Sequence, residues 1–361
     1  MRGALGAGAL GVVLMILGVV VDAEPLLVPG AALLAMAAAA AGWVAAAARG
    51  AAVERKISAR RVMEEEPLSV HITARSGALP FPGGALVDSL LSQPAALRCG
   101  RSIARVRIDV RFARRGPRVL AAPNLALRDP LGVAERTVGG GEDERVLVLP
   151  RLHPVIAAGE GSPLQSGGHA APVAGADVEL DGLRPYRDGA PASRIHWAAL
   201  ARGAGLLERR LRPEGEGRPL VVLDAVAPAD ADDLDAAVRA AASLAHALAR
   251  AGGCSILLPG DRRATPLEAD GRGWPATHAR LALVAPGRTG SALAAAAAGA
   301  RAVYYVTARR GLRAPTRLLR PGQQRVVVVA PGQLPGRRAA FAVAGCTGYV
   351  LASGARAAVG A

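Results

Sequence analysis

The sequence predicts two membrane-spanning helices, then a β-sandwich-like region, then an α/β region. Three observations predict this order: two long uncharged runs at the N-terminus, a middle region of alternating apolar and polar residues, and a C-terminal region where short apolar strands alternate with helical patterns. A chain of 361 residues that is 51% hydrophobic has room for two soluble units. We therefore expect a helical hairpin in 1–50, a β-sandwich-like domain in 51–151, a linker in 152–180, a compositionally unusual segment in 181–217 and an α/β domain in 218–361.

The two uncharged runs extend from Gly3 to Val21 and from Pro25 to Ala48. A spanning helix needs about 20 apolar residues, so both runs are long enough. The second run is rich in alanine, which contributes little transfer free energy, but small residues let two helices approach closely. We therefore expect the runs to pack as a hairpin in the lipid bilayer, helped by the glycines of the first run: Gly3, Gly6, Gly8 and Gly11.

The charges that flank the two runs predict their orientation. Arg2 precedes the first run, basic residues at 49, 55, 56, 60 and 61 follow the second, and the connection carries only Asp22 and Glu24. Because positively charged flanks stay inside, we expect a multi-pass protein of the cell membrane with its soluble domains on the cytoplasmic side. The alternative is a signal peptide cleaved near residue 23, but the run exceeds a usual signal h-region and a second run follows directly.

Residues 53–150 have the pattern of short β-strands. The stretches "LSVHITAR" (68–75) and "ARVRIDVRF" (104–112) alternate apolar and polar residues, as half-buried strands do. Glycine- and proline-rich stretches such as "RSGALPFPGG" separate the strands as turn signals. This spacing is typical of a small β-sandwich, an architecture that often serves as an interaction module.

From residue 218 the pattern changes to alternating strands and helices. "RPLVVLD" (218–224) and "CSILLP" (254–259) are short apolar runs typical of buried parallel strands. Between them, residues 229–253 begin with acidic side chains and end at a glycine pair, which are helix start and stop signals. Further strands are predicted at "ARLALVAP", "RAVYYVTA", "QRVVVVAP" and "FAVAGCTGYVLA", which indicates a doubly wound α/β sheet.

The net charge of +15 comes almost entirely from arginine. Such an excess is typical of proteins that bind nucleic acid or an anionic membrane surface. The arginines are scattered and accompany no nucleic-acid motif, so we interpret them as a compositional bias and expect no nucleic-acid partner. The cysteines Cys99, Cys254 and Cys346 lie far apart without a C-x-x-C pair, which argues against a disulfide framework or a thiolate metal site.

One stretch concentrates the unusual side chains of the chain. Residues 181–203, "DGLRPYRDGAPASRIHWAALARG", combine Tyr186, His196 and Trp197 with carboxylates and several arginines, in a chain that is only 3% aromatic. Neither a G-x-S-x-G elbow, a zinc-binding spacing nor a phosphate-binding loop with its lysine accompanies them. The motifs therefore predict no cofactor and name no reaction.

Three stretches resemble the bacterial domain-of-unknown-function family numbered fifty-eight. They are "RRGPRVLAAPNLALRDPLGVAER" (114–136), "VLVLPRLHP" (146–154) and "DGLRPYRDGAPASRIHWAALARGAGLLERRL" (181–211). The resemblance covers most of the chain and implies two membrane helices, a β-sandwich-like region and a von Willebrand factor A-like α/β region. It makes 181–217 the family signature segment, with a structural or partner-docking cluster of Asp181, Gly182, Arg184, Tyr186, Asp188, Gly189, Arg194, His196, Trp197 and Arg202.

The resemblance also implies partners. Members of this family are commonly encoded beside a MoxR-type AAA+ ATPase and a transglutaminase-like membrane protein. A membrane-anchored, non-catalytic adaptor or assembly factor that acts with the ATPase is therefore the function we expect. Two alternatives stay open: an enzyme of unknown reaction centred on His196 and Asp188, and a basic protein that binds anions or nucleic acid.

The chain departs from the family pattern at two places. The family's Gly-Asp pair is replaced by Gly189-Ala190, although Asp188 lies one residue earlier. Metal-binding von Willebrand A domains carry D-x-S-x-S after their first strand, and these oxygens hold a hard divalent cation. Here Asp224 is followed by "AVAP", without either serine. We therefore predict no metal at Asp224.

The signature segment allows three interpretations. In a structural clasp, Ser193 caps a short helix whose Trp197 and Leu200 pack on the α/β sheet, while arginines hold carboxylates. In a catalytic site, His196 acts as a base oriented by Asp188. In a docking surface, exposed arginine, tyrosine and tryptophan side chains bind a partner. We prefer the clasp, because the segment has no nucleophile or metal motif for His196 to serve.

Overall fold

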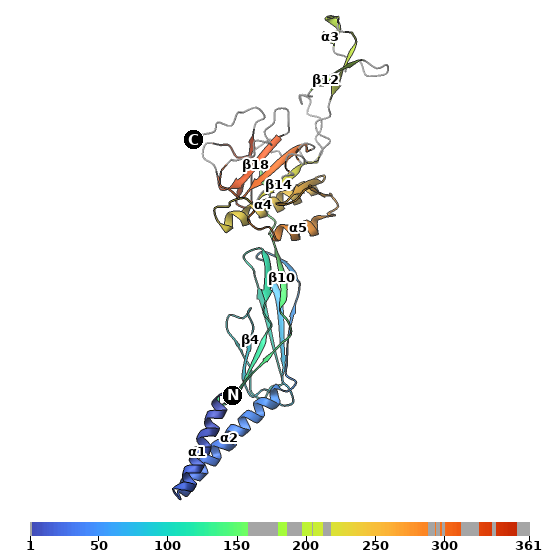
Figure 1. The fold of residues 1–361 in the computed structure, drawn as a ribbon. Helices are drawn as coiled ribbons and strands as arrows, with labels where there is room; N and C mark the ends of the chain where they lie inside the picture. The colour runs from blue at the N-terminus through green and yellow to red at the C-terminus, as the bar shows by residue number, and fades with distance from the viewer. Residues whose placement is uncertain are drawn as a thin grey trace. The chain divides into compact units, whose positions relative to one another are not determined.

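The structure is a computed structural model that describes residues 2–157, 180–185, 197–203, 205–211, 218–287, 293, 297, 300–311, 325–333 and 337–351. The chain divides into two compact units, Met1–Val148 and Leu149–Ala361 (Figure 1). The first unit contains the N-terminal helices and a sheet-rich domain, and the second contains a larger sheet with helices.

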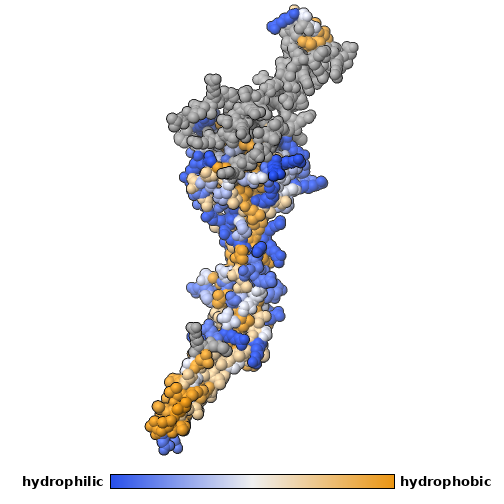
Figure 2. Space-filling view, in the orientation of Figure 1, coloured by the Kyte–Doolittle hydropathy of each residue, from blue (hydrophilic) through white to orange (hydrophobic). Residues whose placement is uncertain are grey.

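Helices α1 (Arg2–Val20) and α2 (Glu24–Ala48) form an antiparallel pair joined by a short turn. Both are long and apolar enough to cross a membrane by length and composition, with mean hydropathies of 2.3 and 1.9 over the tested spans. Few of their side chains are buried, and Figure 2 shows apolar surface concentrated on them. The two helices expected from the sequence are therefore confirmed as helices that could span a bilayer.

The two helices approach each other most closely at a pair of glycines. A Cβ on Gly11 would lie 2.8 Å from the carbonyl oxygen of Gly30, and a Cβ on Gly30 would lie 2.9 Å from that of Gly11. Nothing lies within 4 Å of a Cβ placed on Gly6 or Gly8. Of the glycines expected at the helix contact, Gly11 is there, whereas Gly3 approaches the backbone of a loop of the sheet-rich domain instead.

The sheet-rich domain of the first unit consists of short strands in three sheets around one core. The core side chains come from all three sheets, with Ile72, Leu125 and Val148 among them fully buried, as in a sandwich. The predicted alternation is confirmed in β3, where every second side chain is buried. The sheets are β1 (Ala52–Ile57), β3 (Leu68–Arg75) and β6 (Ile103–Val110); β2 (Arg61–Met63), β10 (Glu144–Leu149) and β7 (Gly116–Leu120); and β5 (Ala95–Ala96), β4 (Gly84–Val87), β8 (Asn124–Arg128) and β9 (Glu135–Gly139).

The last turns of α2 belong to the core of this domain. Ala40, Val44 and Ala47 are buried in the same apolar cluster as the strands. The Ala47 carbonyl accepts a hydrogen bond from the Gly77 amide at 2.7 Å, and the Trp43 indole donates to the Pro80 carbonyl at 3.2 Å. The hairpin is therefore built into the domain, because the carbonyl groups at the end of α2 are satisfied by one of its loops.

One residue counted among the basic flanks is buried in the domain. The Arg55 side chain is 2% exposed and forms ion pairs with Asp88 at 3.0 Å and Glu144 at 2.7 Å. It also donates to the carbonyl oxygens of Leu120 and Ala121. Arg55 is thus a structural cation of the core, and the charge that can orient the hairpin comes from the other basic residues of the flank.

The second unit contains a single large sheet with a parallel centre. Strands β15 (Cys254–Leu257), β14 (Leu220–Asp224), β17 (Ala302–Thr307) and β18 (Arg325–Pro331) are parallel neighbours in that order. Helix α4 (Ala231–Arg250) connects β14 to β15, and α5 (Trp274–Ala282) packs beside α4. Antiparallel strands complete the edges: β16 (Thr265–Leu267) beside β15, and β20 (Cys346–Leu351), β19 (Phe341–Val343) and β11 (Ile156–Ala157) beyond β18.

Both faces of this sheet are covered, as the doubly wound prediction requires. On one face, Val221 and Leu223 of β14 pack in the cluster that includes α4. On the other face, Leu220 and Val222 pack with the helical residue Leu293. Because strand side chains alternate between faces, an almost wholly apolar strand such as β14 must be buried on both.

Two sequence predictions differ from the structure in this unit. The stretch "ARLALVAP" (279–286) was expected as a strand, but its first half completes α5, where His278, Leu281 and Ala282 share a buried face at helical spacing. A short apolar run has no period long enough to separate strand from helix. The linker expected from residue 152 begins with ordered chain, because β11 pairs with β19 and the His153 amide donates to the Ser243 hydroxyl at 2.9 Å.

Candidate functional site

The signature segment contains a small two-stranded sheet and a helical turn. Strand β12 (Leu180–Pro185) pairs antiparallel with β13 (Leu207–Leu211), and α3 (Trp197–Ala201) lies between them in sequence. Gly203 lies two residues after α3 with a left-handed φ of 78°, and its amide donates to the Leu200 carbonyl at 3.0 Å, which ends the helix. The strands pair with each other and form a sheet of their own.

The predicted cluster is only partly described. Asp181, Gly182 and Arg184 lie on β12, Trp197 begins α3 and Arg202 follows it. Tyr186, Asp188, Gly189, Arg194 and His196 lie outside the described residues, as does the proposed cap Ser193. The pairing of His196 with Asp188, on which the catalytic interpretation depends, therefore stays a prediction.

Trp197 is exposed, contrary to the clasp that we preferred. Its side chain is 59% exposed, Leu200 is 36% exposed and Leu206 is 42% exposed. The i, i+3 spacing correctly places Trp197 and Leu200 near each other on a short helix. Exposed large apolar side chains gathered on one segment are typical of a protein-binding surface.

A second candidate site lies at the carboxyl ends of the parallel strands. Strand β14 has β15 on one side and β17 on the other, so the strand order reverses at β14. Open α/β sheets bind ligands at such topological switch points. Asp224 ends β14 and is buried. Its carboxylate accepts hydrogen bonds from the Tyr305 hydroxyl of β17 and from the Val226 amide at 3.1 Å. Asp224 thereby fixes β14 to β17.

An ion-paired arginine lies near the carboxyl ends of the parallel strands. Arg310, which follows β17, donates from Nε to Asp233 at 2.8 Å and from Nη2 to Asp230 at 3.1 Å. Asp230 caps α4 by accepting from the Asp233 amide at 2.7 Å. The hydrogen bond and charge of Asp233, followed by the charge of Asp230, raise the pKa of the Arg310 guanidinium. One arginine from the loop after β17 therefore pairs with two of the carboxylates at the start of α4.

A groove of about 510 Å³ opens beside this ion pair. Asp232, Asp233 and Arg239 of α4 line one side, and His153 and the turn before Gly345 line the other. Its volume suits a small ligand or a short peptide. The described residues that line it include the charged or titratable side chains of Asp232, Asp233, Arg239 and His153, which can bind a polar ligand.

The described residues show no cluster of three or more histidine, cysteine, aspartate or glutamate side chains that could hold a metal ion. Hard divalent cations take six or more oxygen ligands, several of them from the protein. The Asp224 carboxylate already accepts hydrogen bonds from Tyr305 and Val226. That no metal binds at Asp224 stays a prediction, which the missing serines motivate.

The family-like stretch "RDPLG" forms a closed loop in the sheet-rich domain. Asp129 is buried, and its carboxylate accepts hydrogen bonds from the amides of Leu131, at 2.9 Å, and Ala134. The Gly132 amide donates to the Asp129 carbonyl at 3.0 Å. These bonds satisfy the backbone of the turn, so this motif shapes a loop between β8 and β9.

Sequence reasoning missed Tyr305 and Arg310. The signals for them were present: a Tyr-Tyr pair in a strand of a chain with few aromatics, and an arginine pair one residue after that strand. No protein-family model, curated protein or solved structure matches the chain.

Proposed function

We propose that this protein is a membrane-anchored, non-catalytic adaptor that acts with a MoxR-type AAA+ ATPase, as the resemblance of its signature segment implies. A transglutaminase-like membrane protein, the other partner that the resemblance implies, is the second protein we expect in the assembly. The α/β unit is expected to be von Willebrand factor A-like, since Asp224 ends the first parallel strand, where that fold carries its metal-binding motif.

The observation that carries the proposal is the exposure of Trp197 together with Leu200 and Leu206. Tryptophan is enriched among the residues that dominate binding energy at protein interfaces. A large indole left 59% exposed contributes little to the stability of its own chain. The signature segment is therefore better suited to binding another protein than to holding the chain together.

The construction of the first unit supports an anchoring role. Ala40, Val44 and Ala47 of α2 are buried with the strands, so the hairpin and the sheet-rich domain share a core. A partner bound to an anchored protein is held at the membrane, because the hairpin is joined to the domain by packing as well as by the chain. We expect the soluble units on the cytoplasmic side, where the ATPase has access to ATP.

The test is co-isolation from native membranes solubilised in a mild detergent. The full chain should retain a AAA+ ATPase of the MoxR type, and Trp197→Ala should reduce its yield at least about tenfold, as loss of an interface hot spot does. Leu283→Ala is the matched control, because Leu283 is a 56% exposed apolar side chain of the same unit outside the signature segment. The control should retain the ATPase at the wild-type yield.

The adaptor proposal fails if the wild-type chain retains no such ATPase under conditions where it stays folded. The docking role of Trp197 fails if Trp197→Ala and Leu283→Ala give equal yields. If the wild-type chain turns over a substrate and His196→Gln abolishes that turnover, the enzyme alternative is supported instead. Glutamine keeps a hydrogen-bonding amide but cannot act as a base near neutral pH.

A further inference from the structure

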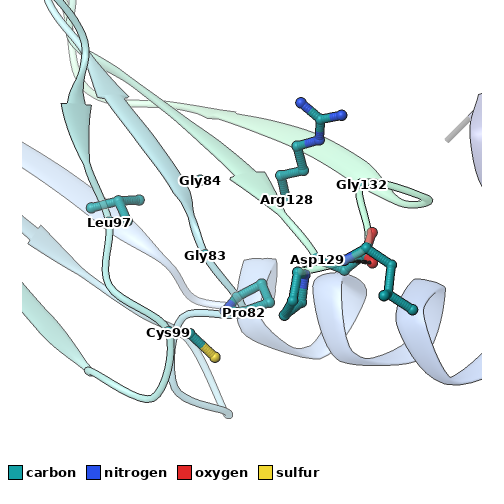
Figure 3. A pocket seen from close by; sticks show the side chains of 10 residues that line it. Pro82, Gly83, Gly84, Leu97, Cys99, Arg128, Asp129 and Gly132 are labelled. Carbon is teal, nitrogen blue, oxygen red and sulfur yellow. Dashed lines mark hydrogen bonds between the residues drawn. The ribbon is translucent and has the colours of Figure 1, made fainter.

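Three loops meet at the end of the sheet-rich domain where the helices enter. They comprise residues 76–83, 97–102 and 129–134, and we call this surface the helix-end face. The Phe81 amide donates to the Arg101 carbonyl at 2.8 Å, and the Gly100 amide donates to the Phe81 carbonyl at 2.9 Å. The Arg128 amide, just before the third loop, donates to the Gly83 carbonyl at 3.3 Å. Figure 3 shows Pro82, Cys99 and Asp129 on these loops, lining a shallow hollow.

The helix-end face is packed directly against both helices. The Gly77 amide in the first loop donates to the last turn of α2, at the Ala47 carbonyl. A Cβ on Gly3 of α1 would lie 2.6 Å from the carbonyl oxygen of Val133 in the third loop. The first and third loops therefore contact the last turn of α2 and the first turn of α1, respectively, without an intervening linker.

The free length of the helices is short for a bilayer. From Ala40 onward one face of α2, with Ala40, Val44 and Ala47, packs in the core of the domain, so roughly 16 residues, Glu24 to Ala39, project beyond this contact. At about 1.5 Å per residue they span about 24 Å, whereas the hydrocarbon core of a typical bilayer is about 30 Å thick. In α1, Ala4 already packs against the same cluster, so its free length is similar. If the hairpin spans the bilayer, the helix-end face reaches the headgroup layer.

The side chains of the helix-end face suit that layer. Leu79 is 43% exposed and Leu131 is 65% exposed, which places two apolar side chains at the loop tips. Trp43 lies at the same level, where interfacial tryptophans are enriched. The nearby carboxylate of Asp129 is buried in its own loop, and Glu135 is the exposed carboxylate that follows. Five exposed arginines surround these residues: Arg49, Arg75, Arg98, Arg101 and Arg128.

From these observations we propose that the helix-end face is a second membrane-contact surface, which inserts Leu79 and Leu131 into the interface and binds anionic lipid headgroups through its arginines. The inference rests on the proposed membrane anchorage, since the hairpin brings the face to the bilayer. Arginine near an anionic leaflet is attracted to it, and long arginine side chains reach the phosphates while their stems stay in apolar surroundings. The domain is thereby held against the membrane in one orientation.

The native cysteines make a direct test possible. Cys99 is exposed in the second loop of the helix-end face, whereas Cys254 and Cys346 are buried, and burial raises the pKa of both buried thiols to about 12. A maleimide fluorophore should therefore label the full chain at Cys99. The labelled chain is reconstituted into phosphatidylcholine vesicles with or without phosphatidylglycerol, and quenching by headgroup-nitroxide lipids is measured.

The control label is Ala113→Cys in a Cys99→Ser chain. Ala113 is exposed in the turn after β6, about 25 Å from the helix-end face by the rise of that strand. We expect Cys99 labels to be quenched severalfold more than Ala113→Cys labels, and quenching to increase with phosphatidylglycerol. Arg98→Gln/Arg101→Gln should abolish that increase, whereas Arg60→Gln/Arg61→Gln, at the other end of β1, should retain it.

The outcomes separate the inference from the anchorage on which it rests. If the chain stays in the vesicles after an alkaline carbonate wash but Cys99 is quenched no more than the Ala113→Cys label, the membrane-contact surface is overturned and the anchorage stands. If quenching at Cys99 is strong but independent of phosphatidylglycerol, the role of the arginines is overturned. If the wash removes the chain from the vesicles, the anchorage fails and the inference fails with it.

Discussion

At the scale of single residues, the second unit contains two histidines, His246 and His278, that contact the ring of Trp274. His278 is buried, and its Nε2 lies 2.8 Å from the Pro150 carbonyl, to which the neutral ring donates. Trp274 stacks on His278 and makes a tilted contact with His246, with ring centroids 4.8 Å apart in both pairs. Burial lowers the pKa of both histidines; the Pro150 hydrogen bond opposes this for His278, and the charge of Arg250 adds to it for His246.

This arrangement predicts that the second unit loses stability in mild acid. Because the folded pKa values lie below the unfolded value of about 6.5, protons bind preferentially to the unfolded chain as the pH falls through that value. The urea midpoint of the second unit should therefore be lower at pH 5 than at pH 7.5. His278→Gln can still donate to Pro150 without titrating, so its midpoint should change less. An equal pH dependence in both proteins would show that His278 is not responsible.

Trp197 shows how far residue patterns in the sequence can reach. Spacing placed Trp197 and Leu200 on one side of a short helix, and α3 has that helix. Spacing cannot say what covers such a face, because burial depends on where distant segments lie. The clasp required burial, and the exposed indole instead favours docking. Truncating an exposed side chain should change unfolding free energy by no more than about 0.5 kcal/mol, so Trp197→Ala separates binding from folding.

At the scale of elements, the contact between α1 and α2 depends on Gly11 and Gly30. A side chain at Gly11 would meet the Gly30 carbonyl at 2.8 Å and the Leu34 side chain at 3.0 Å. We expect Gly11→Val to force the helices apart and to lower the thermal stability of the detergent-solubilised chain by several degrees. Gly8→Val is the matched control, since its Cβ has nothing within 4 Å and should leave the melting temperature unchanged. Equal melting temperatures for both variants would contradict a glycine-mediated contact.

The elements that the sequence predicted best are those with two independent signals. Helix α4 has an acidic start and a glycine pair after its end, and the structure confirms both and adds Asp230 as the N-cap. Strand β14 is a short apolar run bounded by charged and turn-forming residues. By contrast, the first half of "ARLALVAP" is helical, and its apolar run offered no capping residue that would have revealed it. The edge strand β11 has two residues, too few for any periodicity.

At the scale of the whole molecule, the sequence separated a hairpin, a sheet-rich domain and an α/β unit, and the structure contains these elements in that order. The sequence did not reveal that the hairpin and the sheet-rich domain share a core. Alanine and valine are equally suited to lipid and to a protein interior, so Ala40, Val44 and Ala47 carry no mark that assigns them to one. For the same reason, the sequence did not show that only about 16 residues of each helix project beyond its contact with the domain.

We propose that the apolar hairpin anchors the chain and holds its large units at the cytoplasmic face. The test is a pair of reporter fusions after Ala361, with one reporter that is active only inside the cell and one that is active only outside. The positive charge beside α1 and α2 predicts activity of the inside reporter alone, with both fusions recovered in alkali-washed membranes. Activity of the outside reporter, or release of the fusions by alkali, would contradict the claim.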